Sequence, residues 1–348
     1  MSLVELGQLP KHVRYELEAL QAVRHPNVVS LLNRHEKGYG VTLALEYCVT
    51  DLRKLLHLLE GQGPLQPALA KAVVQELLLA IHACHQAGFM HRDVTPSNVL
   101  IAEGSGLVKL ADFGQARRAV EAASEGSADK PSGSGATAAG GPVLSPHVGT
   151  RWYKAPELLF GSRSYTPAVD LWGAGCVFAE LLTGQALFPG SSDIDQICRI
   201  HGVLGSITQE AWPGVVELPD WGKLSFPPSQ AKPLAQVLPG APPAALELLQ
   251  GLLRYDPDRR LTAAAALQAP YFREHPPPAP PQALAALVQQ LVDRSEQQRQ
   301  QQQQELAAFL SGGEAGREGG PGGEAAAAAG WVGLQEGLTV PAGWAGLQ

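Results

Sequence analysis

Three side chains suited to phosphoryl transfer stand close together in the sequence. Asp93 lies in His91-Arg92-Asp93, Asn98 follows it, and Asp112 opens Asp112-Phe113-Gly114. Phosphoryl transfer needs a carboxylate that orients the attacking hydroxyl and divalent cations that bridge the phosphates. Asp93 suits the first task, and Asn98 and Asp112 offer the oxygen ligands that magnesium prefers. Each could alone cap a loop, but their joint order and spacing favour a catalytic site.

The elements around these residues can bring them together. Short strands over 99–102 and 107–110, separated by a Gly-Ser turn, place Asn98 and Asp112 at one edge of a cleft. Residues 28–32 and 41–47 are β-rich apolar runs and predict a second hairpin. Apolar residues at helical spacing predict helices over 10–23, 67–87, 167–183, 193–204, 244–255 and 262–268.

Composition excludes several classes of protein. The 348 residues carry a net charge of −7, so no basic field recommends a nucleic acid as partner. The four cysteines lie far apart, which favours a reduced intracellular compartment. His82, Cys84 and His85 are the nearest approach to a metal cluster, but their helical pattern favours packing. No segment reaches roughly 18 apolar residues, so we expect no membrane partner.

Some segments are too poor in large apolar side chains to pack. Residues 119–142 are almost all Ala, Ser, Gly, Glu and Pro and predict a flexible inserted loop. We expect the ordered domain to end near Arg273, before a stiff proline-rich spacer at 276–281. Leucines over 282–310 flank a glutamine run, which suggests a helix that is solvated or partly formed, with a coiled coil as the alternative.

Together with Ala155-Pro156-Glu157, the catalytic motifs resemble those of eukaryotic protein kinases. The run from Gly149 to Glu157 and Leu187-Phe188-Pro189-Gly190 are similar to the cyclin-dependent and mitogen-activated kinase group. The later run from Leu218 to Phe226 is most similar to the cell-cycle-related kinase branch of the cyclin-dependent kinases. The resemblance covers about residues 9 to 272.

The resemblance implies an α+β, protein kinase-like bilobal fold. It implies a truncated N-terminal β lobe at 1–50, comprising one helix and the last two strands. A complete, mainly helical C-terminal lobe would follow at 51–273, with a flexible activation segment at 115–150. We expect the Pro-, Gln-, Gly- and Ala-rich tail at 274–348 to be largely disordered.

Further site residues are implied by this resemblance alone. Five would serve ATP: Glu46 and Cys48 in the hinge that meets adenine, Asp51 at the ribose, Leu100 under the base, and Glu16 as partner of a phosphate-anchoring lysine. Three would be structural: Asp170, which ties down the catalytic loop, and the buried pair Glu157 and Arg260.

The resemblance also implies residues that act on the activation segment and on the substrate. Ser145 lies at the activating phosphorylation site, with Arg92 and Arg117 as two of the phosphate-binding residues. The third basic residue is replaced by Tyr15. Gly149, Thr150 and Lys154 would contact the residue after the phosphorylated one. Glycine suits the positive φ that a proline-directed kinase needs at this turn, and Lys154 would hold the turned carbonyl group.

Two departures from the kinase pattern bear on activity. The chain has neither a Gly-rich loop nor a strand with an ATP-anchoring lysine before the first helix. Thr95 stands where the family carries a lysine that touches the transferring phosphate, and losing one such contact costs on the order of 10² to 10³ in rate. Gln115, where relatives carry leucine, is a lesser departure.

We therefore expect a serine/threonine kinase that uses ATP and Mg²⁺ and acts on protein substrates. A cyclin-like activator at the 10–23 helix and an upstream activating kinase are the partners that the resemblance implies. It also leaves cytoplasm, nucleus and a ciliary compartment open. The alternative is a catalytically impaired, kinase-like scaffold, and a third hypothesis is an assembly protein that works through its Gln-rich tail.

Overall fold

The computed structural model describes residues 10–37, 40–119 and 144–314, and the predicted loop at 119–142 lies almost wholly outside them. The chain divides into a first unit that ends at Gln289 and a second that begins at Gln290. The helices of this structure are α1 (Lys11–Ala22), α2 (Leu52–Leu58), α3 (Pro67–Gln86), α5 (Pro156–Leu159), α6 (Ala168–Thr183), α7 (Asp193–Leu204), α8 (Leu234–Val237), α9 (Pro243–Leu252), α10 (Ala263–Leu267) and α11 (Pro281–Glu314).

The strands are short and form small antiparallel sheets in the first unit. They are β1 (Leu31–Lys37), β2 (Gly40–Leu45), β3 (Cys48–Asp51), β4 (Phe89–Met90), β5 (Val99–Ala102), β6 (Val108–Leu110) and β7 (Arg117–Arg118). β1 pairs with β2, β3–β5–β6 form a three-stranded sheet, and β4 pairs with β7. The predicted 99–102 and 107–110 hairpin is confirmed as β5 and β6. This fold is α+β, with small sheets and a mainly helical C-terminal part.

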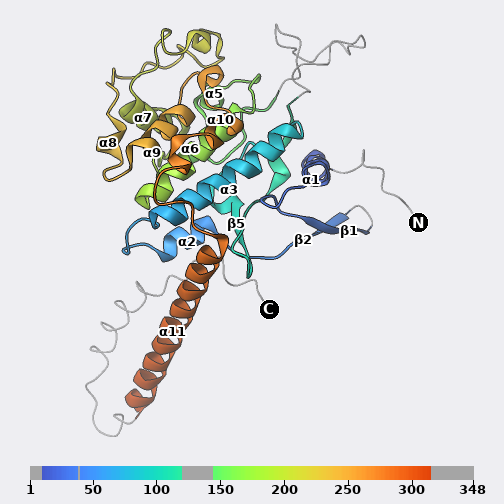
Figure 1. The fold of residues 1–348 in the computed structure, drawn as a ribbon, viewed down its shortest axis with the longest axis vertical. Helices are drawn as coiled ribbons and strands as arrows, with labels where there is room; N and C mark the ends of the chain where they lie inside the picture. The colour runs from blue at the N-terminus through green and yellow to red at the C-terminus, as the bar shows by residue number, and fades with distance from the viewer. Residues whose placement is uncertain (1–9, 38–39, 120–143, 315–348) are drawn as a thin grey trace, which may run out of the picture. The chain divides into compact units, whose positions relative to one another are not determined.

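Helices α3 and α6 form the centre of the helical part. Their buried side chains include Leu77, Ile81, Trp172 and Phe178, and α6 is buried on all sides, as its almost continuous apolar sequence requires. In Figure 1, helices α5 to α10 gather on one side of α3, and α1 with the β1–β2 hairpin lies on the other. By length and hydropathy α3 could cross a membrane, but most of it is buried inside the fold, so it is a core helix.

The first hairpin lies later in the chain than predicted. The apolar run at 28–32 predicted its first strand, whereas β1 pairs with β2 from Leu31 to Lys37. Val28 is buried and forms an isolated parallel bridge with Leu110 of β6. The apolar run therefore packs into the core, and a more polar segment forms the strand.

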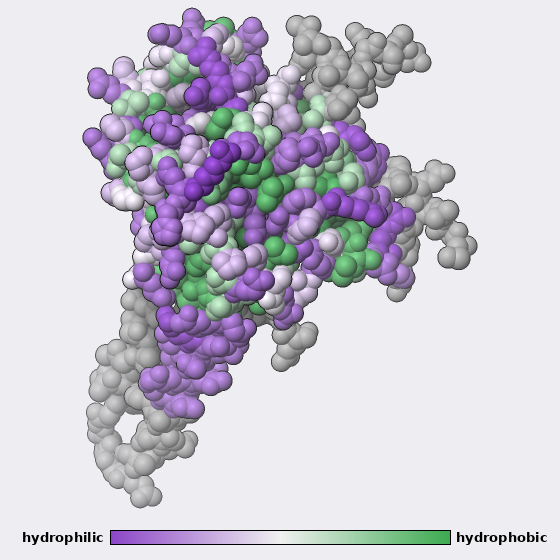
Figure 2. All heavy atoms as spheres, viewed as in Figure 1, coloured by the Kyte–Doolittle hydropathy of each residue, from purple (hydrophilic) through white to green (hydrophobic). Residues whose placement is uncertain are grey.

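The β1–β2 hairpin leaves apolar side chains in contact with solvent. Leu32 and Leu45 are 67% and 37% exposed, and Tyr47 after the hairpin is 60% exposed. The face in Figure 2 is mixed, with apolar patches between polar areas.

The chain beyond Arg273 is more ordered than predicted. Lys71 Nζ of α3 donates to the Glu274 carbonyl at 2.8 Å, and Ala279 N donates to the Ala68 carbonyl at 2.9 Å. Leu284 at the start of α11 is only 2% exposed. These contacts extend the packed unit past the expected boundary. The predicted helix over 282–310 is confirmed in α11, whose part in the second unit contains the glutamine run.

Candidate active site

The segment 91–98, which the kinase resemblance assigns to the catalytic loop, is bonded through its backbone to a buried carboxylate. Asp170 of α6 accepts the backbone N–H groups of His91 at 2.8 Å and Arg92 at 2.6 Å, and its Oδ2 lies 2.8 Å from His85 Nε2. Burial alone would raise the pKa of Asp170, but the hydrogen bond and charge of His85, with those of the loop, hold it below its usual value. Arg92 adopts a φ of 70°, and the paired bonds to Asp170 stabilise this uncommon conformation.

The loop also lies directly against α6. A Cβ atom at Gly173 would approach the Val94 carbonyl oxygen to 2.8 Å, so only glycine allows this contact. His91 then connects the loop to the next motif, because its Nε2 lies 2.9 Å from the Ala111 carbonyl and its ring meets Phe113 edge-on at 4.8 Å. These contacts place the two motifs side by side.

Asp93 is buried at the centre of the site, and both of its carboxylate oxygens accept hydrogen bonds. Oδ1 accepts the backbone N–H of Thr150 at 2.8 Å and its hydroxyl at 3.0 Å. Oδ2 accepts Asn98 Nδ2 at 3.1 Å and Gln115 Nε2 at 3.3 Å. Because its donors come from three separate segments, Asp93 holds a fixed orientation between the catalytic loop and the loop that follows Gly149.

Asn98 and Asp112 each carry an oxygen atom of the kind that magnesium prefers. The Asn98 amide nitrogen donates to both the carbonyl and the carboxylate of Asp93, so the amide oxygen is the atom that could face a cation. Asp112 is exposed, in a left-handed conformation with a φ of 61°, and accepts the Gly114 N–H. The pKa of Glu16 is raised, first by burial and then by the charge of Asp112. A bound divalent cation would offset this negative charge.

Glu16 of α1 faces this site. Within the described ranges it forms no ion pair, and the charge of His12 only partly opposes the rise in its pKa. The kinase resemblance implies a lysine as the partner of this residue, but no such lysine precedes the first helix in the sequence. Thr95 is 3% exposed and begins the short 3-10 turn at Pro96–Asn98 without capping it through its side chain. Neither residue supplies a positive charge to the site.

The residues predicted to bind nucleotide lie along the β2–β3 connection and on β5. Glu46 forms an ion pair with Lys109 at 2.9 Å and accepts the Ser30 N–H. Burial raises the pKa of Glu46, but these bonds outweigh it and lower the pKa.

The other three predicted nucleotide residues are neighbours across one strand pair. Asp51 is opposite Leu100 and Cys48 is opposite Ala102. Leu100 is half-exposed, whereas the rest of β5 is buried. Asp51 also caps α2 by accepting the Lys54 N–H at 2.9 Å. The structure thus clusters these residues, and their contacts with adenine and ribose stay predictions.

The predicted phosphate-binding residues converge near Ser145. Arg92 Nη1 donates to the Tyr165 hydroxyl at 2.6 Å, and that hydroxyl donates to the Ser145 carbonyl at 2.9 Å. Burial raises the pKa of Tyr165, and the charges of Arg92 and Arg117 oppose this rise. Arg117 also stacks on the Tyr15 ring at 3.2 Å from its centroid. Tyr15 therefore contacts Arg117 directly, where relatives place another arginine.

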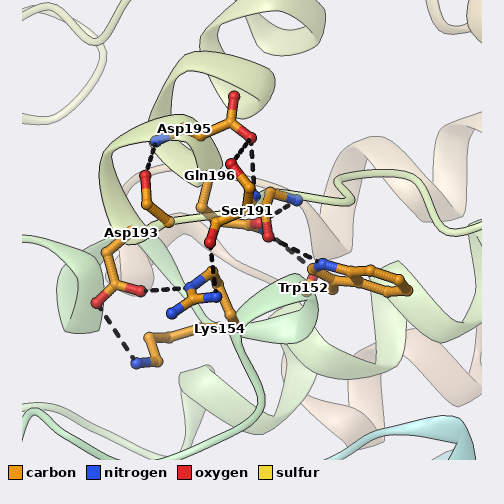
Figure 3. Close-up of polar contacts among 9 residues, drawn as sticks. Trp152, Lys154, Ser191, Asp193, Asp195 and Gln196 are labelled. Carbon is orange, nitrogen blue, oxygen red and sulfur yellow. Dashed lines mark hydrogen bonds and ion pairs between the residues drawn. The ribbon is translucent and has the colours of Figure 1, made fainter.

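The kinase resemblance assigns residues 149–154 to the substrate, and this segment is called the substrate loop. It has the expected turn at Gly149, but Lys154 does not make the contact expected of it. Gly149 has a φ of 77°, and a Cβ atom there would come within 2.9 Å of the Arg92 carbonyl. Lys154 was expected to hold the turned carbonyl, but its Nζ instead lies 3.9 Å from Asp193 Oδ2 at the start of α7, as Figure 3 shows. Asp193 also forms an ion pair with Arg151 at 2.9 Å. Lys154 and Arg151 therefore both lie close to the start of α7.

Helix α7 supports this loop through a second set of bonds. Gln196, which is fully buried, donates to the Trp152 carbonyl at 3.2 Å and accepts the Gly190 N–H at 3.0 Å. The Trp152 indole donates to the Gly190 carbonyl at 3.0 Å (Figure 3). Below the loop, Arg260 contacts both oxygens of Glu157 at 2.9 and 3.1 Å, and both residues are buried. The loop is therefore fixed on two sides.

Four contact residues were not identified as such from the sequence: Gln115, Tyr165, Asp193 and Gln196. Gln115 gave a signal as a polar residue where the kinase pattern implies leucine. Asp193 and Gln196 belong to the run Asp193-Ile194-Asp195-Gln196, which also resembles the cyclin-dependent and mitogen-activated kinase group, but that run did not reveal their contacts. The expected absence of a metal cluster at His82, Cys84 and His85 stays a prediction, although His85 is bound to Asp170 and Cys84 is fully buried.

Comparison with known proteins agrees with this geometry. The protein kinase domain family matches residues 4–272. Cyclin-dependent kinase 20 of Mus musculus is 40% identical over 265 residues, which cover 76% of this chain and 71% of that protein. Cyclin-dependent kinase 20 of Danio rerio is 38% identical over 269 residues, which cover 77% of this chain and 72% of that protein.

A solved structure is similar as well. A chain in the structure of the CAK complex from Chaetomium thermophilum bound to ATP-gamma-S has a TM-score of 0.69 and 34% identity, covering 81% of this chain and 83% of that one. The family match spans the helical core and every predicted catalytic residue. The chain therefore belongs to the protein kinase family and is similar to the cell-cycle-related branch of the cyclin-dependent kinases.

Proposed function

We propose that this chain is a serine/threonine protein kinase that transfers the γ-phosphate of ATP to protein hydroxyl groups. The observation that carries the proposal is the fixed carboxylate of Asp93, held by Thr150 on one oxygen and by Asn98 on the other. A carboxylate in this position can orient the substrate hydroxyl and accept its proton. Asn98 and Asp112 would hold Mg²⁺, which neutralises charge on the phosphates when bound.

Preference for a proline after the phosphorylated residue is a finer part of this proposal. The left-handed backbone at Gly149 supports it, because a turned carbonyl leaves no acceptor for the N–H of the next substrate residue. Proline lacks that N–H and loses nothing, whereas another residue buries an unpaired donor. We expect roughly tenfold discrimination from such a loss.

Regulation by a cyclin-type partner on α1 and by phosphorylation of Ser145 completes the proposal. The solved relative is a chain of a complex, and α1 carries Glu16, which faces Asp112. Ser145 is exposed, and Tyr165 connects its backbone to Arg92. A phosphate at Ser145 could therefore act on the catalytic loop through residues already in contact.

The test is phosphate transfer by the full chain with and without its catalytic carboxylates. Wild type, Asp93→Asn and Asp112→Asn would be incubated with Mg²⁺, labelled ATP and paired Ser-Pro and Ser-Ala peptides. We expect both variants to lose at least about 10² in turnover, and wild type to prefer Ser-Pro. Equal transfer by wild type and Asp112→Asn would contradict the enzymatic function.

The second candidate function is a kinase-like scaffold, and two departures from the kinase pattern favour it. Thr95 brings no charge, and Glu16 forms no ion pair with a lysine or arginine within the described ranges. A scaffold would show no Mg²⁺-dependent thermal shift with ATP. A shift in wild type that disappears in Asp112→Ala would support nucleotide binding and argue against a pure scaffold.

A further inference from the structure

The side chain of Gln115 joins two segments that lie far apart in the sequence. Its Nε2 donates to Asp93 Oδ2 at 3.3 Å, and its Oε1 accepts the backbone N–H of Gly149 at 2.8 Å. The carbonyl oxygen of Gln115 accepts Arg92 Nε at 2.6 Å. One residue thus contacts the catalytic loop twice and the substrate loop once.

Both side-chain contacts require a primary amide. An amide carries a donor and an acceptor on the same planar group, whereas a carboxylate can only accept and an apolar side chain can do neither. Leucine, which the kinase resemblance implies at this position, could fill the space but could not form either bond. The pair of contacts therefore depends on the amide of Gln115.

The bond to Asp93 acts on the oxygen that is least constrained by the substrate loop. Thr150 supplies both donors to Oδ1, while Oδ2 depends on Asn98 and Gln115. Asn98 is also suited to bind a cation, whereas Gln115 has no proposed contact with the nucleotide. Of the two donors to Oδ2, Gln115 therefore serves only to orient the carboxylate. Thr95 adds no bond to this carboxylate among the described residues.

We propose that Gln115 is a positioning residue that fixes the Asp93 carboxylate and the Gly149 turn relative to one another. Its donor half orients the group that receives the substrate hydroxyl, and its acceptor half holds the loop that receives the next substrate residue. The inference rests on the proposed kinase function.

Two variants of the full chain distinguish the role of the amide N–H donor of Gln115 from the role of its carbonyl acceptor. Gln115→Glu keeps an acceptor for the Gly149 N–H and removes the donor, whereas Gln115→Met keeps the length of the side chain and removes both. Gln236→Met and Gln236→Glu, on the exposed surface of α8, are the matched controls. Turnover on Ser-Pro peptides, the KM for ATP, and hydrogen–deuterium exchange of the 144–153 segment would be measured for each.

We expect both Gln115 variants to lower kcat about tenfold or more, with the KM for ATP within twofold of wild type, because a misplaced carboxylate affects the chemical step. Exchange of the 144–153 segment should rise in Gln115→Met and stay near wild type in Gln115→Glu.

A kcat for Gln115→Met equal to that of its Gln236 control would overturn the donor role, and unchanged exchange would overturn the acceptor role. Wild-type turnover no higher than that of Asp112→Asn would instead overturn the proposed function, and this inference with it.

Discussion

At the scale of single residues, the buried carboxylate of Asp170 connects α6 to the catalytic loop. It accepts two successive backbone N–H groups of the catalytic loop and contacts His85. Asp170→Asn replaces one acceptor oxygen by a donor that faces other donors, so we expect a loss of about 2 kcal/mol or more in stability and a large loss of turnover. Chemical denaturation and the kinase assay would measure the two effects. A variant as stable as wild type would contradict this role.

The same residue predicts a dependence of stability on pH. The pKa of Asp170 is lowered in the folded chain, by His85 and loop bonds that outweigh burial. Its contribution is therefore present above the usual aspartate pKa of about 3.9 and is lost as pH falls through the lower folded pKa. Thermal denaturation between pH 3 and pH 7 should show a steeper acid loss in wild type than in Asp170→Asn. Parallel profiles would contradict the assignment.

Residue types and spacing predict which residues form the catalytic motifs, but they do not predict which neighbours contact them. Asp93, Asn98 and Asp112 were identified because few other tasks need those types in that order. Gln115 and Tyr165 act through partners that are distant in the sequence, and only the folded chain determines which donor meets which acceptor. Lys154 shows the same limit, since its Nζ lies 3.9 Å from Asp193, a contact that the sequence does not reveal.

At the scale of elements, α1 is attached to the activation segment through an aromatic contact. The guanidinium group of Arg117 lies over the Tyr15 ring, and Arg118 Nε lies 3.9 Å from Glu18. A stack of this kind contributes about 0.5 to 2 kcal/mol. Tyr15→Leu should therefore lower the melting temperature by about 2 to 6 °C and reduce turnover, because α1 carries Glu16. Tyr15→Phe keeps the ring and should stay near wild type, and an equal loss in both would exclude the stack as the cause.

Helix α7 supports the substrate loop through Gln196, which is fully buried and bridges Gly190 and Trp152. Gln196→Leu removes both bonds and leaves the Trp152 carbonyl without this donor, whereas the Gly190 N–H keeps the Phe188 carbonyl at 3.0 Å. We therefore expect a cost of about 1 kcal/mol. We expect the KM for Ser-Pro peptides to rise more than the KM for ATP, since the bridge lies beside the substrate loop. Steady-state kinetics would measure both constants, and equal changes would contradict the assignment.

Periodicity predicted the longest helices closely, whereas one of the two predicted hairpins began at the wrong residue. The 193–204 pattern coincides with α7, and 167–183 differs from α6 by one residue at its start, because a long amphipathic or apolar repeat has few alternative packings. The 28–32 strand was wrong because Val28 and Val29 pack into the core, and short apolar runs do not reveal whether they pair laterally or pack.

At the scale of the whole molecule, the packed first unit includes residues that composition assigned to a disordered tail. Gly106, in the β5–β6 turn, has a φ of 71°, and a Cβ atom there would overlap the Pro281 carbonyl group. Leu284 and Val288 are 2% and 4% exposed. A proline-rich spacer thus leads back onto the fold, which local composition could not predict because the receiving surface is formed by the β5–β6 turn and α3.

Truncation tests this boundary directly. Each buried Leu or Val side chain contributes roughly 1.5 to 3 kcal/mol, so a chain that ends at Arg273 should melt about 6 °C or more below the full chain. A chain that ends at Glu314 retains α11 and is the matched control, with an expected change within about 2 °C. Gly106→Ala in the full chain should reproduce part of the loss, because the added methyl group displaces the start of α11 without removing any residue. If the Arg273 truncation melts with the control, the packed unit ends where composition predicted, and α11 contributes nothing to the stability of the kinase domain.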